Sequence, residues 1–268
     1  MRHAPRKRFG QHFLIDPAVL SAIVEAVAPR PGDRVVEIGP GLGALTGALL
    51  ERVPALDAVE IDRDLAGRLR RRWPQSRLRV HEADALDFDF AALAGDGRLR
   101  LVGNLPYNVS SPLLVRLLAF LPVIADQHFM LQKEVVDRIV ADPGGADYGR
   151  LGVLLQAHCG VERLFDVPPA AFDPPPRVDS SVVRLVPLAR PRVRDTASLE
   201  RLLAAGFGQR RKMLRGTLLP WLRAQGVDGE AAPFALVPTA RPEQVPVEVW
   251  ARLADALVQS GASHGSDR

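Results

Sequence analysis

The sequence predicts an α/β fold, in which helices cover a mostly parallel, doubly wound sheet and a small C-terminal helical domain follows. Three features indicate this class. Short apolar runs alternate with segments of helical periodicity, an order typical of parallel sheets. The first apolar run leads through a glycine-rich turn into a helix. Two successive strands without a helix between them predict an antiparallel edge of the sheet. Prolines and arginines replace the apolar runs at residues 187–194, so we expect one domain at 1–188 and a helical one at 189–268.

Each element has its own signal in the sequence. The first helix carries apolar residues at helical spacing and ends at a Pro-Arg-Pro-Gly-Asp segment, while the strands are short apolar runs between turn residues. In chain order, helices are expected at residues 17–28, 44–52, 64–72, 112–120, 133–141 and 151–158. Strands are expected at residues 34–38, 55–61, 78–81, 99–102, 127–131, 161–167 and 180–187. Ser110 or Ser111 is a suitable N-cap for the helix at 112–120. In the second domain, Gly/Pro turns separate helices at residues 198–207, 212–223 and 247–258.

Composition limits the class of protein. With 268 residues, 47% of them hydrophobic, the chain can form one sizeable domain and a smaller one, which excludes wholesale disorder. No apolar run approaches the roughly 20 residues that cross a bilayer, and the basic N-terminus lacks the apolar core of a secretory signal. Cys159 is the single cysteine, so it cannot form an internal disulfide. We therefore expect a cytoplasmic protein. A monomer is the default expectation, and no metal-binding residues are predicted.

The net charge of +4 is unevenly distributed. Residues 1–188 carry 23 basic and 23 acidic residues, whereas residues 189–268 carry 12 basic and 8 acidic ones. Segments 1–10 and 201–223 are basic and contain no acidic residue. Such segments fit contacts with a polyanion, and solvated basic faces are the alternative interpretation. The candidate residues for such a polyanion contact are Arg6, Lys7, Arg8, Arg210, Arg211 and Lys212.

The turn 39–43, after the first expected strand, is the first part of a predicted cofactor site. Gly39 and Gly41 let the main chain approach a ligand closely because they lack Cβ atoms. The same segment satisfies a dinucleotide fingerprint, and a purely structural glycine turn is the other alternative.

Two acidic residues follow the second and third strands. Glu60 can accept hydrogen bonds from both ribose hydroxyls, although Asp62 and Asp64 are close rivals. Asp84 can accept from an adenine amino group. The chain has no Gly-Lys-Ser/Thr phosphate loop and nothing that resembles a hydride-transfer site, which favours S-adenosylmethionine over a dinucleotide.

The turn 104–107 predicts the acceptor site, because it comes directly after an apolar strand, at the sheet edge where ligands bind. The Asn104 side-chain oxygen and the Leu105 carbonyl can each accept a hydrogen of an adenine amine, which would aim its lone pair at an electrophilic methyl group. Pro106 fixes the turn, and Tyr107 would stack on the target ring. These residues predict methyl transfer to an adenine nitrogen, and an ordinary strand-end turn is the alternative.

The proline-rich segment 171–180 contributes a second aromatic residue. Its prolines are stiff and would hold Phe172 and Arg177 as a rigid wall. Phe172 is expected to form the other face of a base sandwich, with packing in the core as the competing interpretation.

These motifs resemble the bacterial 16S ribosomal RNA adenine dimethyltransferase family over nearly the full length of the chain. The similar segments are residues 7–14, 37–46, 60–62, 84–85, 104–107, 132–134, 172–181 and 207–212. Each motif is weak alone, but the set in this order is highly specific. The resemblance implies a Rossmann-like, S-adenosylmethionine-dependent methyltransferase sheet. It also implies N6,N6-dimethylation of two adjacent adenines in the 3′-terminal hairpin loop of 16S rRNA, within an assembling small (30S) ribosomal subunit.

The resemblance further implies which residues hold the cofactor: His12, Leu14, Gly39, Glu60, Asp84 and Asn104, with Gly41 and Ala85 beside them. Many relatives carry Asn at the position of His12, whose main chain can serve in the same way. A 23S-directed resistance methyltransferase, a DNA adenine methyltransferase and a ribosome-assembly binding factor are the alternatives. The motifs at the two ends of the chain favour the 16S type.

Overall fold

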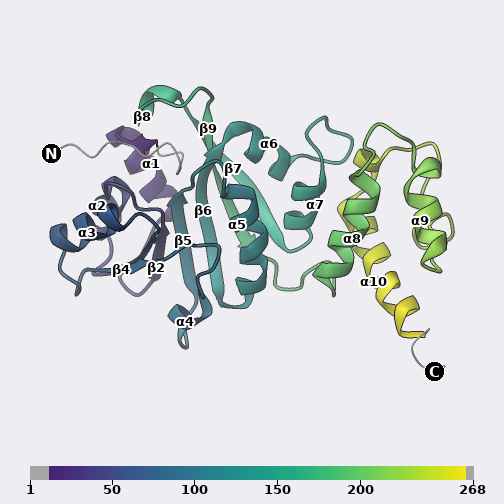
Figure 1. Cartoon of the computed structure of the whole chain (residues 1–268), viewed down its shortest axis with the longest axis horizontal. Helices are drawn as coiled ribbons and strands as arrows, with labels where there is room; N and C mark the ends of the chain where they lie inside the picture. Colours follow the sequence, from purple (N-terminus) through teal and green to yellow (C-terminus); the bar gives the residue numbers. More distant parts are fainter. Residues whose placement is uncertain (1–11, 264–268) are drawn as a thin grey trace. The chain divides into compact units, whose positions relative to one another are not determined.

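The predicted α/β fold is confirmed by the computed structural model, which describes residues 12–263 (Figure 1). A seven-stranded mixed sheet has the order β4-β3-β2-β5-β6-β9-β7, and a two-stranded sheet joins β1 to β8. The strands are β1 (Phe13–Leu14), β2 (Arg34–Ile38), β3 (Leu56–Glu60), β4 (Leu78–Glu82), β5 (Leu99–Asn104), β6 (Ile124–Gln132), β7 (Cys159–Val167), β8 (Phe172–Asp173) and β9 (Ser180–Pro187). The apolar runs of the sequence thus form the large sheet, whereas β1 and β8 are too short to leave a periodic signal.

The strand order changes direction at β2, which lies between β3 and β5. The pairs β2–β3, β2–β5, β3–β4 and β5–β6 are parallel. The pair β6–β9 is antiparallel. The two successive strands of the expected edge, β7 and β9, lie side by side at the end of the sheet. Ligands of open α/β sheets bind at the carboxyl ends of the strands, beside such a switch point. The ends of β2 and β5 are therefore where a functional site is expected.

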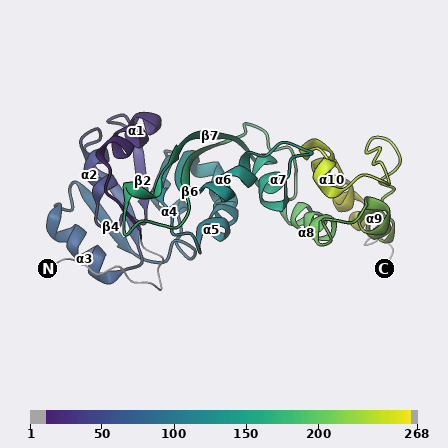
Figure 2. The same ribbon diagram turned by 90° about the horizontal axis from the view of Figure 1, so that it is seen from above.

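Helices lie on both faces of this sheet, and Figure 2 shows α1 and α5 on opposite sides. They are α1 (Pro17–Val27), α2 (Ala44–Leu50), α3 (Arg63–Arg72), α4 (Ala91–Ala94), α5 (Ser110–Leu117) and α6 (Lys133–Val140). The first three bury apolar side chains such as Val24, Leu49 and Leu69 in one core with Val102 of β5. Within residues 12–263, no helix is both long and apolar enough to cross a membrane.

A capping carboxylate holds the N-terminus of α1. Asp16 accepts hydrogen bonds from the main-chain N–H groups of Ala18 (2.8 Å) and Val19 (3.3 Å), and Pro17 occupies the first helical position. We expect Asp16→Ala to lower the free energy of unfolding by about 1 kcal/mol, because two N–H groups lose their acceptor. Urea denaturation measures the loss, with Asp16→Asn as a control that keeps an acceptor. An alanine variant as stable as the wild type would contradict this role.

The described chain forms two compact units. The first contains the residues up to Val136 together with Val161–Pro187, and the second contains Asp137–Gly160 and the residues from Leu188 onward. The boundary at Pro187 lies one residue from the expected one, but the segment 137–160 differs, since it was expected in the first domain. Proline and arginine composition marks a linker, but it does not show which unit an apolar helix such as α7 (Arg150–Gln156) packs against.

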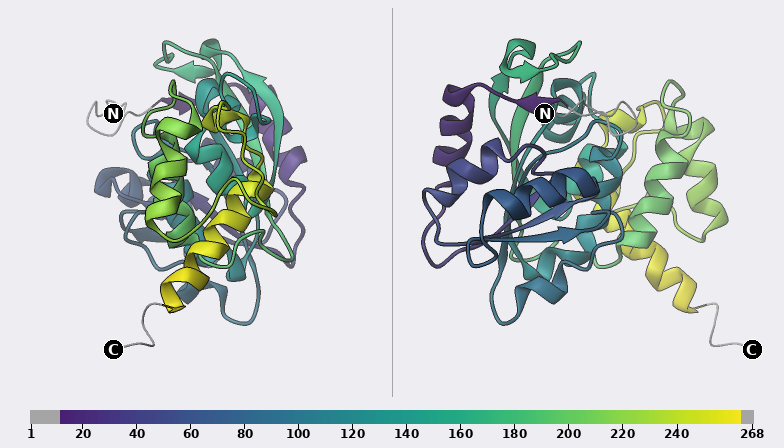
Figure 3. Two further views of the ribbon diagram at one scale, coloured as in Figure 1. Left: turned by 90° about the vertical axis from the view of Figure 1, so that its right-hand side faces the viewer. Right: turned by 60° about the vertical axis from the view of Figure 1, so that its left-hand side comes forward.

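Trp250 lies at the centre of the second unit. It is fully buried on α10 (Val247–Ser263), and its ring centroid is 5.4 Å from that of Phe207, at the end of α8 (Thr196–Phe207). Gly206 faces this ring, where a Cβ would come within 2.5 Å of it. Figure 3 shows α8, in green, beside the yellow α10. Tyr148 extends the core by donating a hydrogen bond to the Val245 carbonyl at 2.8 Å.

Two local expectations are corrected by the structure. The helix expected at 212–223 is shorter, because Thr217 has a non-helical backbone (φ −137°, ψ −82°) between a single turn at Leu214–Gly216 and α9 (Leu218–Ala224). The N-cap of α5 is Val109 rather than Ser110 or Ser111.

Candidate functional site

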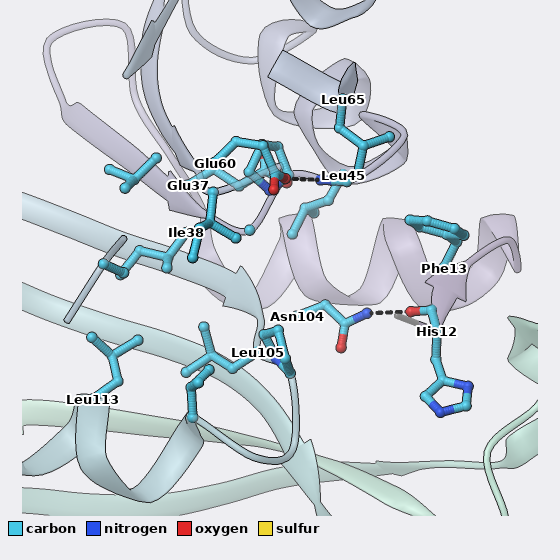
Figure 4. A pocket seen from close by; sticks show the side chains of 18 of the residues that line it. His12, Phe13, Glu37, Ile38, Leu45, Glu60, Leu65, Asn104, Leu105 and Leu113 are labelled. Carbon is cyan, nitrogen blue, oxygen red and sulfur yellow. Dashed lines mark hydrogen bonds between the residues drawn. The ribbon is translucent and has the colours of Figure 1, made fainter. Parts of the chain in front are cut away.

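A cavity lies at the carboxyl ends of β2, β3 and β5, at the switch point of the sheet (Figure 4). Except for Phe172, all the residues predicted to bind a cofactor or an acceptor line it: His12, Leu14, Gly39, Gly41, Glu60, Asp84, Ala85, Asn104, Leu105, Pro106 and Tyr107. The structure thus brings the predicted donor and acceptor groups, which span 96 positions of sequence, into one cavity.

The turn after β2 follows a course that only glycine adopts readily. Gly39, Gly41 and Gly43 have φ values of +69°, +59° and +80°, in the left-handed region. A Cβ on Gly41 would lie 3.1 Å from the Phe13 ring, and one on Gly43 would lie 2.7 Å from the Trp73 ring. These glycines therefore serve both the turn and its packing, while their main chain lines the cavity.

Glu60 fastens this turn to the end of β3. Its side chain is buried, its Oε1 accepts from the Asp62 N–H at 2.8 Å, and its Oε2 accepts from the Gly41 N–H at 3.1 Å. Burial raises the pKa of Glu60, and these two N–H donors oppose the shift. Each carboxylate oxygen still keeps a lone pair for a ligand. Of its rivals, Asp62 caps α3 by accepting from the Asp64 and Leu65 N–H groups, and neither Asp62 nor Asp64 lines the cavity.

Asp84 and Ala85 reach the cavity from the turn after β4. Strands β3 and β4 pair in register up to Glu60 and Glu82, which brings the two acidic strand ends side by side. The Asp84 Oδ1 accepts from the Leu86 N–H at 2.9 Å, so the carboxylate is oriented by its own turn.

Glu37 is a cavity residue that the sequence analysis did not assign. It lies on β2, it is 2% exposed, and Thr46 Oγ1 donates a hydrogen bond to its Oε2 at 2.5 Å. Burial raises the pKa of Glu37 to about 7, and the nearby charge of Glu60 adds to the shift while the Thr46 hydrogen bond opposes it. A glutamate inside an apolar strand was the available signal, because such strands seldom bury a charge.

The Asn104 amide has a fixed orientation. Its Nδ2 donates to the His12 carbonyl at 3.0 Å, and because a carbonyl can only accept, Oδ1 is the atom turned away, as Figure 4 shows. The next residue is anchored by the main chain, since the Leu105 N–H donates to the Met130 carbonyl at 3.1 Å. The end of β5 therefore presents a side-chain acceptor, Oδ1, on a rigid strand.

Tyr107 is held from two sides. Its hydroxyl is hydrogen-bonded to Ser180 Oγ at 3.1 Å, and its ring stacks with that of His12, with centroids 5.6 Å apart and planes inclined by 27°. The His12 Nδ1 donates to the Pro174 carbonyl at 2.8 Å, which fixes the imidazole. Burial raises the pKa of Tyr107. One face of the Tyr107 ring is thus covered by His12, so a stacked base is left with the other face.

The structure corrects the expectation that Phe172 forms a second wall for a base. Phe172 lies in β8 opposite Leu14 of β1, it is 3% exposed, and it belongs to the apolar core beneath α1 and α2. Successive residues of a strand point to opposite sides, so the exposed Asp173 faces solvent while Phe172 faces the core. Phe172 therefore packs in the core, as the competing interpretation had it.

The predicted RNA-binding residues fall in two places. Arg6, Lys7 and Arg8 lie outside the described residues. Arg210, Arg211 and Lys212 are all exposed in the turn after α8, where Arg210 donates a hydrogen bond to the Ala146 carbonyl.

The chemistry of the lining limits the ligand. Carboxylates stand at the ends of β3 and β4 and an amide at the end of β5, yet none of the described lining residues is lysine or arginine. The cavity therefore offers acceptors for ribose hydroxyls and amino groups but no cationic clamp for a pyrophosphate, which argues against the dinucleotide alternative.

Comparison with known proteins gives consistent results. The family model for ribosomal RNA adenine dimethylase matches residues 2–257. "Ribosomal RNA small subunit methyltransferase A" of Bordetella petrii is 59% identical over 263 residues, which cover 97% of this chain and 98% of the relative. The protein of the same name from Thiobacillus denitrificans is 60% identical over 225 residues, covering 83% of this chain and 88% of the relative.

Two solved structures are similar along most of their length. A dimethyladenosine transferase from Plasmodium falciparum has a TM-score of 0.78 at 26% identity, with 93% of this chain and 98% of that chain covered. The 23S rRNA methyltransferase ErmE has a TM-score of 0.69 at 27% identity, with 92% and 100% covered.

Proposed function

Because this chain belongs to the ribosomal RNA adenine dimethylase family, we propose that it dimethylates N6 of two adjacent adenines in the 3′-terminal hairpin loop of 16S rRNA. The proposed substrate is the assembling 30S subunit. Family membership confirms the resemblance seen in the sequence, the class of enzyme (an S-adenosylmethionine-dependent methyltransferase) and its cofactor. The choice of RNA is supported by relatives named for the small subunit.

The observation that carries the proposal is the orientation of Asn104. An adenine amino nitrogen is a poor nucleophile, because its lone pair is delocalised into the ring. The Asn104 Oδ1, kept free by the bond from Nδ2 to His12, would accept one amine hydrogen, and the Leu105 carbonyl would accept the other. Both contacts localise the lone pair and aim it, so the chain supplies position rather than a strong base. Pro106 holds the turn, and the free face of Tyr107 supports the ring.

The cavity also fits the cofactor, which supplies an electrophilic methyl group when bound. We assign the Glu60 carboxylate to the ribose hydroxyls and the Asp84 carboxylate to the adenine amino group, because both acids line the cavity at adjacent strand ends. The close main-chain approach at Gly39 and Gly41 suits the rest of the molecule. The remaining assigned contacts are the main chain of His12, Leu14, Ala85 and Asn104, all of which line the same cavity.

The direct test is transfer of labelled methyl groups to unmethylated small subunits, large subunits and free rRNAs in parallel. We expect label in the small subunit, at the two adjacent adenines. Label on large-subunit RNA alone would overturn the assignment and favour the 23S type. Binding to small subunits without any transfer would favour the assembly-factor alternative.

We also propose that Arg210, Arg211 and Lys212 contact rRNA phosphates, since all three are exposed in one turn. Changing them together to alanine should weaken binding to the small subunit and lower the slope of log Kd against log salt by about 2. Filter binding at several KCl concentrations measures both. A matched control replaces three exposed arginines of the same unit, Arg190, Arg241 and Arg252. Equal losses of binding in both variants would favour the alternative interpretation, in which the cluster is a solvated basic face.

The proposed cellular setting follows from the proposed substrate. Ribosomal RNA in an assembling subunit places the enzyme in the cytoplasm, and the single cysteine, Cys159, agrees with a reducing compartment. We propose a monomer, which sedimentation of the purified protein tests.

A further inference from the structure

The region of α3 is strongly basic, although the first 188 residues together carry equal numbers of basic and acidic residues. Between positions 63 and 79 the chain has seven arginines and a single acidic residue, Asp64. The arginines are Arg63, Arg68, Arg70, Arg71, Arg72, Arg77 and Arg79. None of them was assigned a function from the sequence, and α3 lies in the same unit as the cavity.

Part of this charge is neutralised within the fold. Arg63 Nε and Arg70 Nη1 both pair with the Glu82 carboxylate, at 3.0 and 3.1 Å. Arg79 pairs with Asp57 at 2.9 Å. The two pairs with Glu82 join one flank of α3 to β4 and offset part of the charge of that flank, whereas the Arg79–Asp57 pair joins β4 to β3.

The opposite flank keeps its charge. Arg68, Arg71 and Arg72 are exposed and follow the i, i+3, i+4 spacing that places side chains on one helix face. Leu65 and Leu69, on the buried face, pack into the unit. None of the three arginines forms an ion pair with a described residue. We call Arg68, Arg71 and Arg72 the α3 arginine surface.

The α3 arginine surface adjoins the rim of the cavity. The Arg72 guanidinium lies 4.3 Å from the centroid of the Trp73 ring, and its Nη1 donates to the Leu42 carbonyl at 3.4 Å. Leu42 lines the cavity and is itself 36% exposed. The Arg72 end of the α3 arginine surface therefore contacts a residue that lines the cavity.

We propose that the α3 arginine surface binds the phosphate backbone of the RNA that carries the target adenines, an inference that rests on the proposed function. Guanidinium groups match phosphate oxygens in a two-pronged geometry, and unpaired exposed arginines have no competing carboxylate to release. The apolar residues of α3 are buried, so the helix presents no apolar face to a membrane. Contacts here would hold the RNA while its base enters the cavity.

The test compares two double variants of the same helix. Arg68→Gln with Arg71→Gln removes two charges from the α3 arginine surface, and Arg63→Gln with Arg70→Gln removes two from the paired flank. Binding to unmethylated small subunits is measured at several KCl concentrations for both variants and the wild type, with cofactor affinity and thermal unfolding as checks on the fold.

We expect the Arg68/Arg71 variant to bind about tenfold more weakly at 0.1 M salt, with a slope of log Kd against log salt lowered by about 1.5. The Arg63/Arg70 variant should keep the wild-type slope. Unchanged binding by the Arg68/Arg71 variant, or equal losses in both variants, would overturn the inference, since equal losses reflect overall charge rather than contact. If the wild type binds only another RNA, and loses that binding when Arg68 and Arg71 are changed, the proposed function is wrong but the inference about the α3 arginine surface is supported.

Discussion

Asn104→Ala is expected to abolish most methyl transfer, with a loss in kcat on the order of 10²- to 10³-fold, while cofactor affinity falls much less. The size is that of removing one preorganised hydrogen-bonding group from a reacting centre. The variant loses the Oδ1 acceptor that would localise the amine lone pair. It also loses the bond from Nδ2 to the His12 carbonyl, which is one of several contacts that hold His12.

Single-turnover transfer and calorimetric titration with the cofactor separate these two effects. The control is Gln225→Ala, which removes an exposed amide just after α9, outside the cavity, and should keep kcat within about threefold of the wild type. Thermal unfolding of both variants shows whether the loss of the His12 contact disturbs the fold. Wild-type transfer by Asn104→Ala would mean that the lone-pair argument is wrong.

The sequence predicted the strands and the cavity residues well because their signals are local. The strand at Arg34–Ile38 has the expected bounds, and a glycine turn followed by acids at two strand ends needs only parallel topology to converge. The resemblance adds to this the class of RNA, which the physical signals alone left open among adenine methyltransferases.

The features that the sequence did not predict depend on contacts between distant segments. Phe172 lies in a proline-rich segment, which suggested that its ring would line a binding site. Its pairing with Leu14, 158 positions earlier in the chain, instead turns the ring into the core. Likewise, His12 was assigned only to the cofactor, whereas its ring covers Tyr107. A two-residue strand has no periodicity, so neither contact could be read from the chain.

The charge pattern of the sequence did not reveal the α3 arginine surface, for a different reason. A balance summed over 188 residues averages the arginines of α3 with acids that lie elsewhere in the fold. Only the structure shows that Arg63 and Arg70 share Glu82, while Arg68 and Arg71 form no ion pair within residues 12–263. Net charge along a sequence therefore predicts a polyanion partner, but it does not locate the surface that meets it.

The second large effect is expected from Glu37→Gln, which should make the protein more stable above pH 7 by roughly 3 kcal/mol while leaving it unchanged near pH 4. Burial raises the pKa of Glu37 from 4.5 in the unfolded chain to about 7 in the folded one. Between these values the folded state holds a proton that the unfolded state has released. The stability of the wild type therefore falls as the pH rises from 4.5 through 7, because the buried carboxylate must then ionise.

Glutamine stays neutral, and its side-chain oxygen can still accept the hydrogen bond from Thr46 Oγ1, so the variant avoids this cost without losing the contact. Urea denaturation of both proteins without cofactor, at half-unit steps from pH 4 to 8, gives the difference in free energy of unfolding. Subtracting the two profiles removes the titration of every other group that is unchanged between them. Glu51→Gln, an exposed residue just after α2, is the control and should follow the wild-type profile. Parallel profiles for Glu37→Gln and the wild type would show that Glu37 does not titrate in this range.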